Sequence, residues 1–230
     1  MSCILALETA TDCCSVALWI NGAVHERSQL APRQHVALLL PFVDALLDEC
    51  GISTAQLDAV AFGRGPGSFT GLRIAAGMAQ GIAFGVDVPV QPVSTLAALA
   101  QGVLQQQTPG RILAALDARM GEVYWGVYRC GDDGLVSAEG EERVISPEHT
   151  PVAGDHDRVG VGDGWSTYAD VLMARHRLSH GSVFADMKPQ AAGVARLAAA
   201  AFDRGESLPA ELAAPIYLRN NVADKPRPGK

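Results

Sequence analysis

The chain has 230 residues, of which 48% are hydrophobic, and a formal net charge of −7. This length and composition allow one large domain or two small ones with a substantial core. The acidic balance argues against direct binding of a nucleic-acid backbone, because such binding needs a basic surface.

The cysteines and the first residues indicate a cellular compartment. Five cysteines form no CxxC pair, so their odd number and irregular spacing argue against a disulfide framework or a zinc site. No apolar run approaches the roughly 18 residues of a membrane span. Residues 1–12 lack a basic region and carry Glu8 and Asp12, unlike a signal peptide. We expect a soluble cytoplasmic protein with no membrane partner.

The chain opens with the pattern of a three-stranded meander. Residues 3–8 (CILALE) are an almost wholly apolar run, which is typical of a buried strand. Residues 14–20 are strand-like again, and Asn21-Gly22 is a strong signal for a two-residue hairpin turn. Residues 23–29 form the returning strand.

Helices and strands then alternate to the middle of the chain. The first helix closes at Gly51, a typical terminating residue, and Ser94 or Thr95 caps the last one. The predicted elements are a helix at 34–50, a strand at 57–62, a helix at 69–85, a strand at 88–92 and a helix at 94–106.

The second half repeats the pattern of the first. Residues 112–117 (ILAALD) mirror residues 4–8 (ILALE), since each apolar strand ends in one carboxylate. The elements that follow are a strand at 122–130, a turn at 131–134, a return at 135–145 and helices at 164–178 and 189–203.

This internal repetition predicts an α/β fold of two similar lobes. The order of elements suits the ribonuclease-H-like lobes of actin-like ATPases and sugar kinases, each with a mixed sheet and flanking helices. We place the boundary at Thr108-Pro109-Gly110, which divides the chain into lobes at 1–108 and 109–222. The last helix could pack back on the first lobe, and residues 223–230 are expected to be disordered because they lack apolar content.

The glycine-rich stretch FGRGPGSFTGLRIA, residues 62–75, poses the question of phosphate binding. It lacks the lysine and spacing of a P-loop, and threonine stands where the dinucleotide fingerprint needs its last glycine. A sharp turn between a strand and a packed helix is the favoured interpretation. Weak anion binding at the helix N-terminus, beside Arg73, stays open as the alternative.

Two carboxylates are candidates for cleft chemistry. Glu8 and Asp117 could hold magnesium or act as a general base, with Thr9 and Arg73 as further weak candidates for nucleotide binding. A carboxylate that ends an apolar strand can equally satisfy the amides of the following turn, and we favour this interpretation. We therefore expect no cofactor and no catalytic residue.

Metal and nucleophile motifs are weak. The pair His176 and His180 (HRLSH) has helical spacing, but Arg177 stands where a zinc protease needs glutamate, so we expect both histidines on a solvated surface. No GxSxG motif is present, and nothing in the sequence places a base beside Ser68.

The helices predicted at 34–50 and 69–85 carry more apolar surface than one core contact needs. The second contains a single charge, Arg73, and the spaced glycines Gly77, Gly81 and Gly85. Each glycine in a helix interior lowers the stability of the helix by roughly 1 kcal/mol relative to alanine. Either both helices are buried within the lobe, or they form a helical subunit interface.

Several segments, in order along nearly the whole chain, resemble the bacterial TsaB (YeaZ) family of tRNA threonylcarbamoyladenosine biosynthesis. The most specific is GPGSFTGLR. The matching segments are residues 4–18 (ILALETATDCCSVAL), 34–51, 63–75, 115–128 (ALDARMGEVYWGVY) and 215–220 (PIYLRN).

This resemblance implies the two-lobed actin-like fold and a non-catalytic role. The family is paralogous to the catalytic subunit TsaD, which carries a metal-binding HxxxH and transfers threonylcarbamoyl to adenosine 37 of tRNAs that read codons starting with A. The family member binds TsaD through its first two helices, self-associates through the same surface, and is joined by the ATPase TsaE. Contact with tRNA is only indirect.

The resemblance and the apolar helices together predict a partner interface on the first two helices. Ala79→Glu is expected to abolish partner binding while the lobe stays folded. The predicted interface residues are His35, Val36, Leu39, Phe42, Val43, Leu46, Leu72, Ala76, Gly77, Ala79 and Gly81.

Two enzyme hypotheses remain as alternatives. The family is grouped with glycoprotease-like proteins, so a peptidase acting on its partner is the first, although no nucleophile–base arrangement supports it. An independent nucleotide-dependent kinase is the second, and it would need a second phosphate loop with paired glycines, which residues 118–121 lack.

Overall fold

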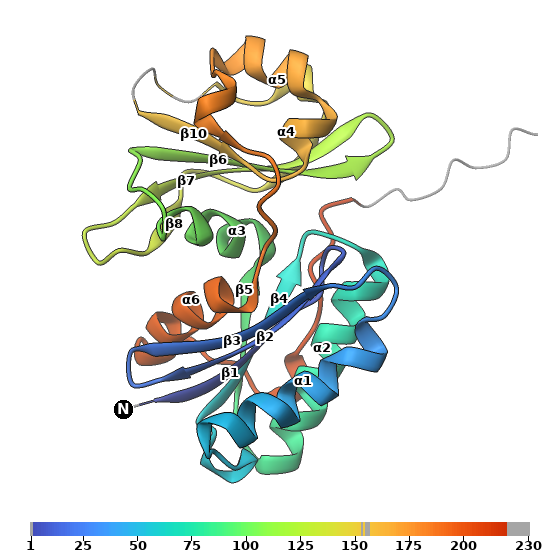
Figure 1. Ribbon diagram of the computed structural model, residues 1–230, viewed down its shortest axis with the longest axis vertical. Coiled ribbons are helices and arrows are strands. Elements are labelled where there is room, and N and C mark those ends of the chain that lie inside the picture. The colour runs from blue at the N-terminus through green and yellow to red at the C-terminus, as the bar shows by residue number, and fades with distance from the viewer. Residues whose placement is uncertain (1, 153, 155–156, 220–230) are drawn as a thin grey trace, which may run out of the picture.

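The computed structural model describes residues 2–152, 154 and 157–219 (Figure 1). The predicted disordered tail, residues 223–230, lies outside these. The strands are β1 (Cys3–Glu8), β2 (Cys13–Ile20), β3 (Ala23–Leu30), β4 (Ala59–Gly65), β5 (Val90–Ser94), β6 (Arg111–Arg119), β7 (Glu122–Cys130), β8 (Val136–Ala138), β9 (Arg143–Ile145), β10 (Arg158–Val161) and β11 (Val183–Phe184). The helices are α1 (His35–Cys50), α2 (Phe69–Val86), α3 (Thr95–Val103), α4 (Gly164–Thr167), α5 (Ala169–His176) and α6 (Ala191–Asp203).

These strands form two mixed sheets. The first has the order β3-β2-β1-β4-β5, with an antiparallel meander followed by parallel pairing of β1 with β4 and of β4 with β5. The second has the order β11-β10-β6-β7-β8, with β9 also pairing with β7. There β6 is antiparallel to β7 and parallel to β10. The predicted two-lobed α/β fold of ribonuclease-H-like type is confirmed.

Local sequence signals placed most of the elements of the first lobe. Asn21 and Gly22 turn the chain between β2 and β3 with positive φ angles of 50° and 98°. Helix α1 ends where Gly51 adopts the left-handed conformation, which a residue without Cβ adopts at little cost. Ser94 caps α3 by accepting a hydrogen bond from the Ala97 amide at 3.1 Å.

Three predictions need correction. The strand expected at 57–62 is β4, which starts at Ala59 and runs on to Gly65, because it pairs with β5 as far as that glycine. The return expected at 135–145 is two short strands. The helix expected at 164–178 is split into α4 and α5 at Tyr168, whose ψ of 38° departs from helical geometry. Trp165 holds α4 against the second sheet, because its indole N–H donates to the Leu113 carbonyl of β6 at 2.9 Å.

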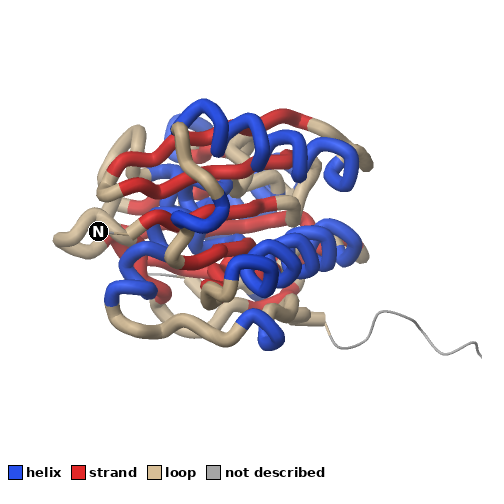
Figure 2. The backbone as a smooth tube through the Cα atoms, turned by 90° about the horizontal axis from the view of Figure 1, so that it is seen from below, coloured by secondary structure: helices blue, strands red, loops and turns tan. Residues whose placement is uncertain are grey.

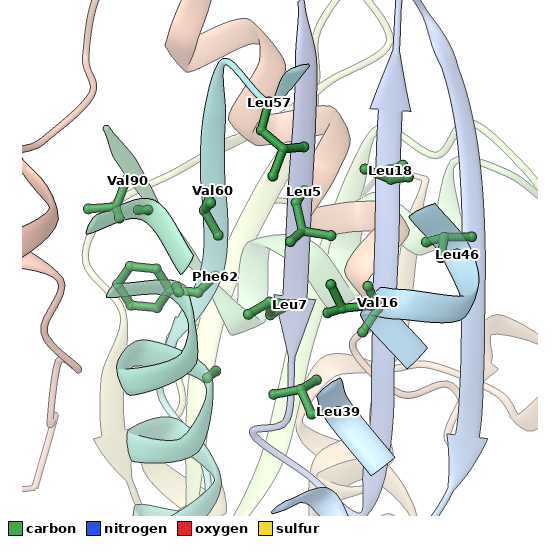
Figure 3. Close-up of a cluster of buried hydrophobic side chains, with 14 of the residues drawn as sticks. Leu5, Leu7, Val16, Leu18, Leu39, Leu46, Leu57, Val60, Phe62 and Val90 are labelled. Atoms are coloured by element: carbon green, nitrogen blue, oxygen red, sulfur yellow. The ribbon is translucent and has the colours of Figure 1, made fainter. Parts of the chain in front are cut away.

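The first sheet is covered on both faces because its central strands are apolar on both faces. On one face, Leu5 and Leu7 of β1 pack against α1 and α2 (Figure 3). On the other face, Ile4 and Ala6 pack against α6. Viewed from below, strands lie between helices (Figure 2). Several residues on the outer sides of α1 and α2 stay exposed in the described part of the chain, among them Val36, Leu40 and Phe84.

Helices α3 and α6 each pack on the sheet of the other half of the chain. Leu96 and Leu99 of α3 join the core of the second sheet, whereas Val194 and Ala198 of α6 join that of the first. The two helices contact each other between the lobes (Figure 1). The division of the chain near residue 108 stays a prediction.

Candidate functional site

A cleft of about 760 Å³ lies between the two lobes. The β1–β2 turn, the start of α1 and the start of α2 line it from the first lobe. The end of β6 and Asp163 line it from the second lobe. These are the segments in which the sequence placed the candidate carboxylates and the glycine-rich loop.

Glu8, at the end of β1, is fully buried. Its carboxylate accepts a hydrogen bond from the Ala10 amide at 2.7 Å and one from the Thr95 hydroxyl at 3.2 Å. A Cβ at Gly63 would lie 2.0 Å from a Glu8 carboxylate oxygen, so only glycine leaves room for this carboxyl. Burial raises the pKa of Glu8 to about 7, against the hydrogen bonds that lower it. The side chain is enclosed in the lobe and does not open on the cleft.

Asp117 repeats this geometry in the second lobe. Its carboxylate accepts from the Arg119 amide at 2.8 Å, as Glu8 accepts from Ala10, and it also pairs with the Arg119 guanidinium at 3.0 Å. Both carboxylates therefore satisfy the amide two residues further along the chain. The Thr9 hydroxyl is likewise engaged, donating to the Gly71 carbonyl at 2.7 Å.

The glycine-rich loop packs against the first hairpin turn. A Cβ at Gly71 would lie 2.0 Å from the Thr9 carbonyl oxygen, and one at Gly67 would lie 2.6 Å from that of Ala10. The Ser68 amide donates to the Ala10 carbonyl at 2.7 Å, and the Ser68 hydroxyl caps α2. The glycines thus permit close backbone contact between the loop and the turn, which is the favoured structural interpretation.

Arg73, in the first turns of α2, is engaged by two aromatic side chains. Its guanidinium lies 3.7 Å from the centroid of the Phe69 ring, and its Nε donates to the Tyr217 hydroxyl at 3.1 Å. The four weak candidates for nucleotide binding, Glu8, Thr9, Asp117 and Arg73, are all engaged within the protein.

The predicted surface position of His176 is wrong. It was expected on a solvated surface, but its side chain is fully buried and stacks on Trp125, with ring centroids 4.7 Å apart. Helix α5 ends at His176, so the helical spacing does not extend to the exposed His180. No group of three or more His, Cys, Asp or Glu residues in the described part of the chain is placed to hold a metal ion.

The tautomer of His176 follows from its surroundings. The Thr150 hydroxyl donates to the Pro147 carbonyl at 2.9 Å, so it accepts from Nε2 of His176, which lies 2.8 Å away. Nδ1 is buried without a partner among the described residues. A second proton there would be unsatisfied, and burial lowers the pKa of His176 to about 4.

The eleven predicted interface residues separate into two groups. Val36, Gly77 and Gly81 are exposed and Phe42 is partly exposed. The others are buried, chiefly against the first sheet: His35, Leu39, Val43, Leu46, Leu72, Ala76 and Ala79. Ala79→Glu would bury a charge and destabilise the lobe, so the expectation that this variant stays folded is wrong.

The outer faces of α1 and α2 carry large apolar side chains and open glycines. Val36 is 72% exposed, Leu40 45% and Phe84 76%. A Cβ at Gly77, Gly81 or Gly85 would meet no heavy atom within 4 Å in the part of the chain that the structure describes. We call these exposed residues of the two helices, Val36, Leu40, Gly77, Gly81 and Phe84, the outer helical face; Val36 also lines the cleft.

Sequence reasoning missed two basic residues near the cleft. Lys188, in the segment before α6, lies 3.8 Å from Asp12 and 3.4 Å from Asp163. Arg219 pairs with Glu122 at the start of β7. Each pair joins residues far apart in sequence, so no spacing within the chain could have revealed it.

Within the described residues, no helix is both long and apolar enough to cross a membrane.

Comparison with known proteins agrees with this architecture. Residues 25–152 match the family model described as "TsaD: tRNA N6-adenosine threonylcarbamoyltransferase". The chain is 42% identical to the "tRNA threonylcarbamoyladenosine biosynthesis protein TsaB" of Escherichia coli strain K12, over 99% of each chain. It is 40% identical to the protein of the same name from Haemophilus influenzae, over 99% of this chain and 98% of that one.

A solved structure described as "YeaZ from Pseudomonas aeruginosa" superposes with a TM-score of 0.88 at 45% identity, over 95% of this chain and 100% of that one. The fold and the cleft thus define a two-lobed α/β protein of the broad family that the TsaD model describes. More narrowly, the chain belongs to the TsaB (YeaZ) family.

Proposed function

We propose that this chain is a non-catalytic subunit in tRNA threonylcarbamoyladenosine biosynthesis. In this role it binds the catalytic subunit TsaD through the outer helical face and supports transfer of threonylcarbamoyl to adenosine 37 of tRNAs reading codons that start with A. The relatives' name supports the pathway. The outer helical face supports the mode of action.

The observation that carries the proposal is the pairing of exposed apolar side chains with open glycines. Phe84 and Val36 are more than two-thirds exposed. Exposed large apolar surface of this kind marks interaction sites. Gly77 and Gly81 leave room for the backbone of a second helix to approach α2 closely. A helix from a partner, or from a second copy of the chain, would bury both features together.

The polar groups in and near the cleft favour a non-catalytic role over an enzymatic one. The Glu8 and Asp117 carboxylates accept hydrogen bonds from turn amides, and the Ser68 hydroxyl caps a helix. These groups already serve the fold. We further propose that the chain works in the cytoplasm, that the ATPase TsaE joins the complex, that the chain forms a homodimer without TsaD, and that tRNA is contacted only indirectly.

The decisive experiment places a charge on the outer helical face without disturbing the core. Gly81→Glu adds a side chain where the described chain leaves open space, so the monomer should still fold, as circular dichroism would show. Partner binding should be lost, because the charge would be buried without a counter-ion. Light scattering of the variant, alone and mixed with TsaD from the same host, measures both self-association and heterodimer formation.

The matched control is Ala174→Glu, an exposed position on α5 of the second lobe. This variant should bind TsaD like the natural chain. A folded Gly81→Glu protein that still forms the heterodimer would overturn the proposed interface.

A further inference from the structure

The segment Ala213–Arg219 passes from the first lobe to the second. In Figure 1 it runs beside α2 toward the β6–β7 hairpin. Its backbone is seated on the end of β4, where the Ile216 amide donates to the Arg64 carbonyl at 2.7 Å. A Cβ at Gly65 would lie 2.7 Å from the Ile216 carbonyl oxygen, so the two backbones are in direct contact.

Side chains of α2 hold the same segment to the first lobe. The ring of Tyr217 lies 5.4 Å from that of Phe69, and its hydroxyl accepts a hydrogen bond from Arg73 at 3.1 Å. The guanidinium of Arg73 lies over the Phe69 ring. These three side chains, from two distant parts of the chain, form one cluster at the start of α2.

Two residues further on, Arg219 is held by the second lobe. Its guanidinium pairs with the Glu122 carboxylate, donates to the Arg119 carbonyl at 3.3 Å and lies 3.1 Å from the Met120 sulfur. Only 13% of the Arg219 side chain is exposed, so the pair is shielded from water more than a surface ion pair. This seven-residue segment therefore contacts the first lobe at one end and the second lobe at the other.

A second connection joins two residues that line the cleft, Asp12 and Asp163. The ammonium of Lys188 lies between Asp12, in the β1–β2 turn of the first lobe, and Asp163, which follows β10 in the second. The other Asp163 oxygen accepts a hydrogen bond from the Asp117 amide at 2.9 Å, which orients it on the second lobe. One cation thus joins the two walls of the cleft.

The contacts described for residues 213–219 involve neither α3 nor α6. Lys188 lies nearer to them, because it follows Met187, whose methyl carbon would lie 3.1 Å from a Cβ at Gly102 of α3. The packed contact between α3 and α6 holds the lobes together at one place but does not by itself prevent them from rotating about it. Contacts that cross between the lobes elsewhere oppose such a rotation. The β6–β7 turn and the β1–β2 turn are the parts of the two lobes that these connections engage.

We propose that the segment Ala213–Arg219 and Lys188 are two inter-lobe ties that hold the cleft at one opening. Added salt should weaken the more exposed Lys188–Asp12 pair more than the shielded Arg219–Glu122 pair. The proposal concerns the isolated chain and is independent of the function proposed above.

Hydrogen exchange of the full chain, followed by mass spectrometry, tests the ties. Each of the variants Arg219→Ala and Lys188→Ala removes one tie, and the double variant removes both. Loss of one charge-assisted hydrogen bond is expected to speed exchange about tenfold. The faster exchange should be confined to residues 10–12 and 119–122, and small-angle scattering of the double variant should show a larger radius of gyration.

The control is Arg27→Ala, which removes an ion pair with Glu49 that lies within the first lobe. Its exchange at the cleft should match that of the natural chain. The exchanged pair Arg219→Glu with Glu122→Arg should recover part of the slow exchange, because it restores the ion pair but not the hydrogen bond to the Arg119 carbonyl. A double variant with unchanged exchange and radius, or with exchange raised evenly over both lobes, would overturn the proposal.

Discussion

Glu8 is a fully buried carboxyl whose protonation is linked to folding. Burial raises its pKa from 4.5 to about 7 in the folded chain. The folded state therefore keeps a proton that the unfolded state loses as the pH rises above 4.5. Stability contributed by this group is complete below pH 4.5 and is lost as the pH rises to 7, by about 3 kcal/mol.

Glu8→Gln should remove this loss, because an amide has no proton to lose in this range. Relative to the natural chain, the variant's free energy of unfolding should rise by about 3 kcal/mol between pH 4.5 and 7. Urea unfolding at several pH values measures the difference. A difference that stays constant with pH would contradict the prediction.

The comparison with the natural chain is necessary because His176 acts in the opposite direction. Its lowered pKa, about 4 against 6.5, means that stability is lost as the pH falls from 6.5 toward 4. The two slopes oppose each other in the natural chain. Only the difference between the variant and the natural chain isolates Glu8.

At the scale of an element, two glycines make helix α2 less stable than alanine at the same positions would. Gly77 and Gly81 lie in its interior and face open space. Alanine at either position should raise the free energy of unfolding of the monomer by about 0.5–1 kcal/mol, at a protein concentration too low for self-association. The same methyl group should weaken TsaD binding if a partner helix packs closely there. Thermal melting and titration calorimetry measure the two effects.

Gly71 is the matched control for these substitutions. It is also in α2, but a Cβ there would lie 2.0 Å from the Thr9 carbonyl oxygen. Gly71→Ala should therefore lower stability. Lower stability in Gly77→Ala would show that its surface is not open.

For the whole molecule, the outer helical face and the cleft should differ in their effect on tRNA modification. Asp117→Asn keeps an oxygen that can accept from the Arg119 amide, so the lobe should stay intact. If the chain acts as a partner subunit, Gly81→Glu should reduce threonylcarbamoyl transfer by the reconstituted complex far more than Asp117→Asn does. Transfer lost in Asp117→Asn with the complex intact would assign the cleft a direct role.

The sequence alone determined the succession of elements in the first lobe, the two-lobed fold and the family, whereas it missed β10 and β11 of the second lobe. Those signals are local: the apolar run of β1, the Asn21-Gly22 turn and the closing Gly51 each act within a few residues of chain. The repeat of a carboxylate after an apolar strand also predicted how Glu8 and Asp117 would be engaged, because each meets an amide two residues away.

The tertiary structure alone decided which surfaces are buried and which residues join the lobes. Helix α1 is apolar well beyond one stripe, so its pattern could not show that Leu39 and Leu46 are buried while Val36 stays exposed. His176 lies in a polar stretch of sequence yet is buried among aromatic rings supplied by other elements. Lys188 and Arg219 likewise meet partners far away in sequence. Burial and long-range pairing depend on how distant segments pack, which no local pattern encodes.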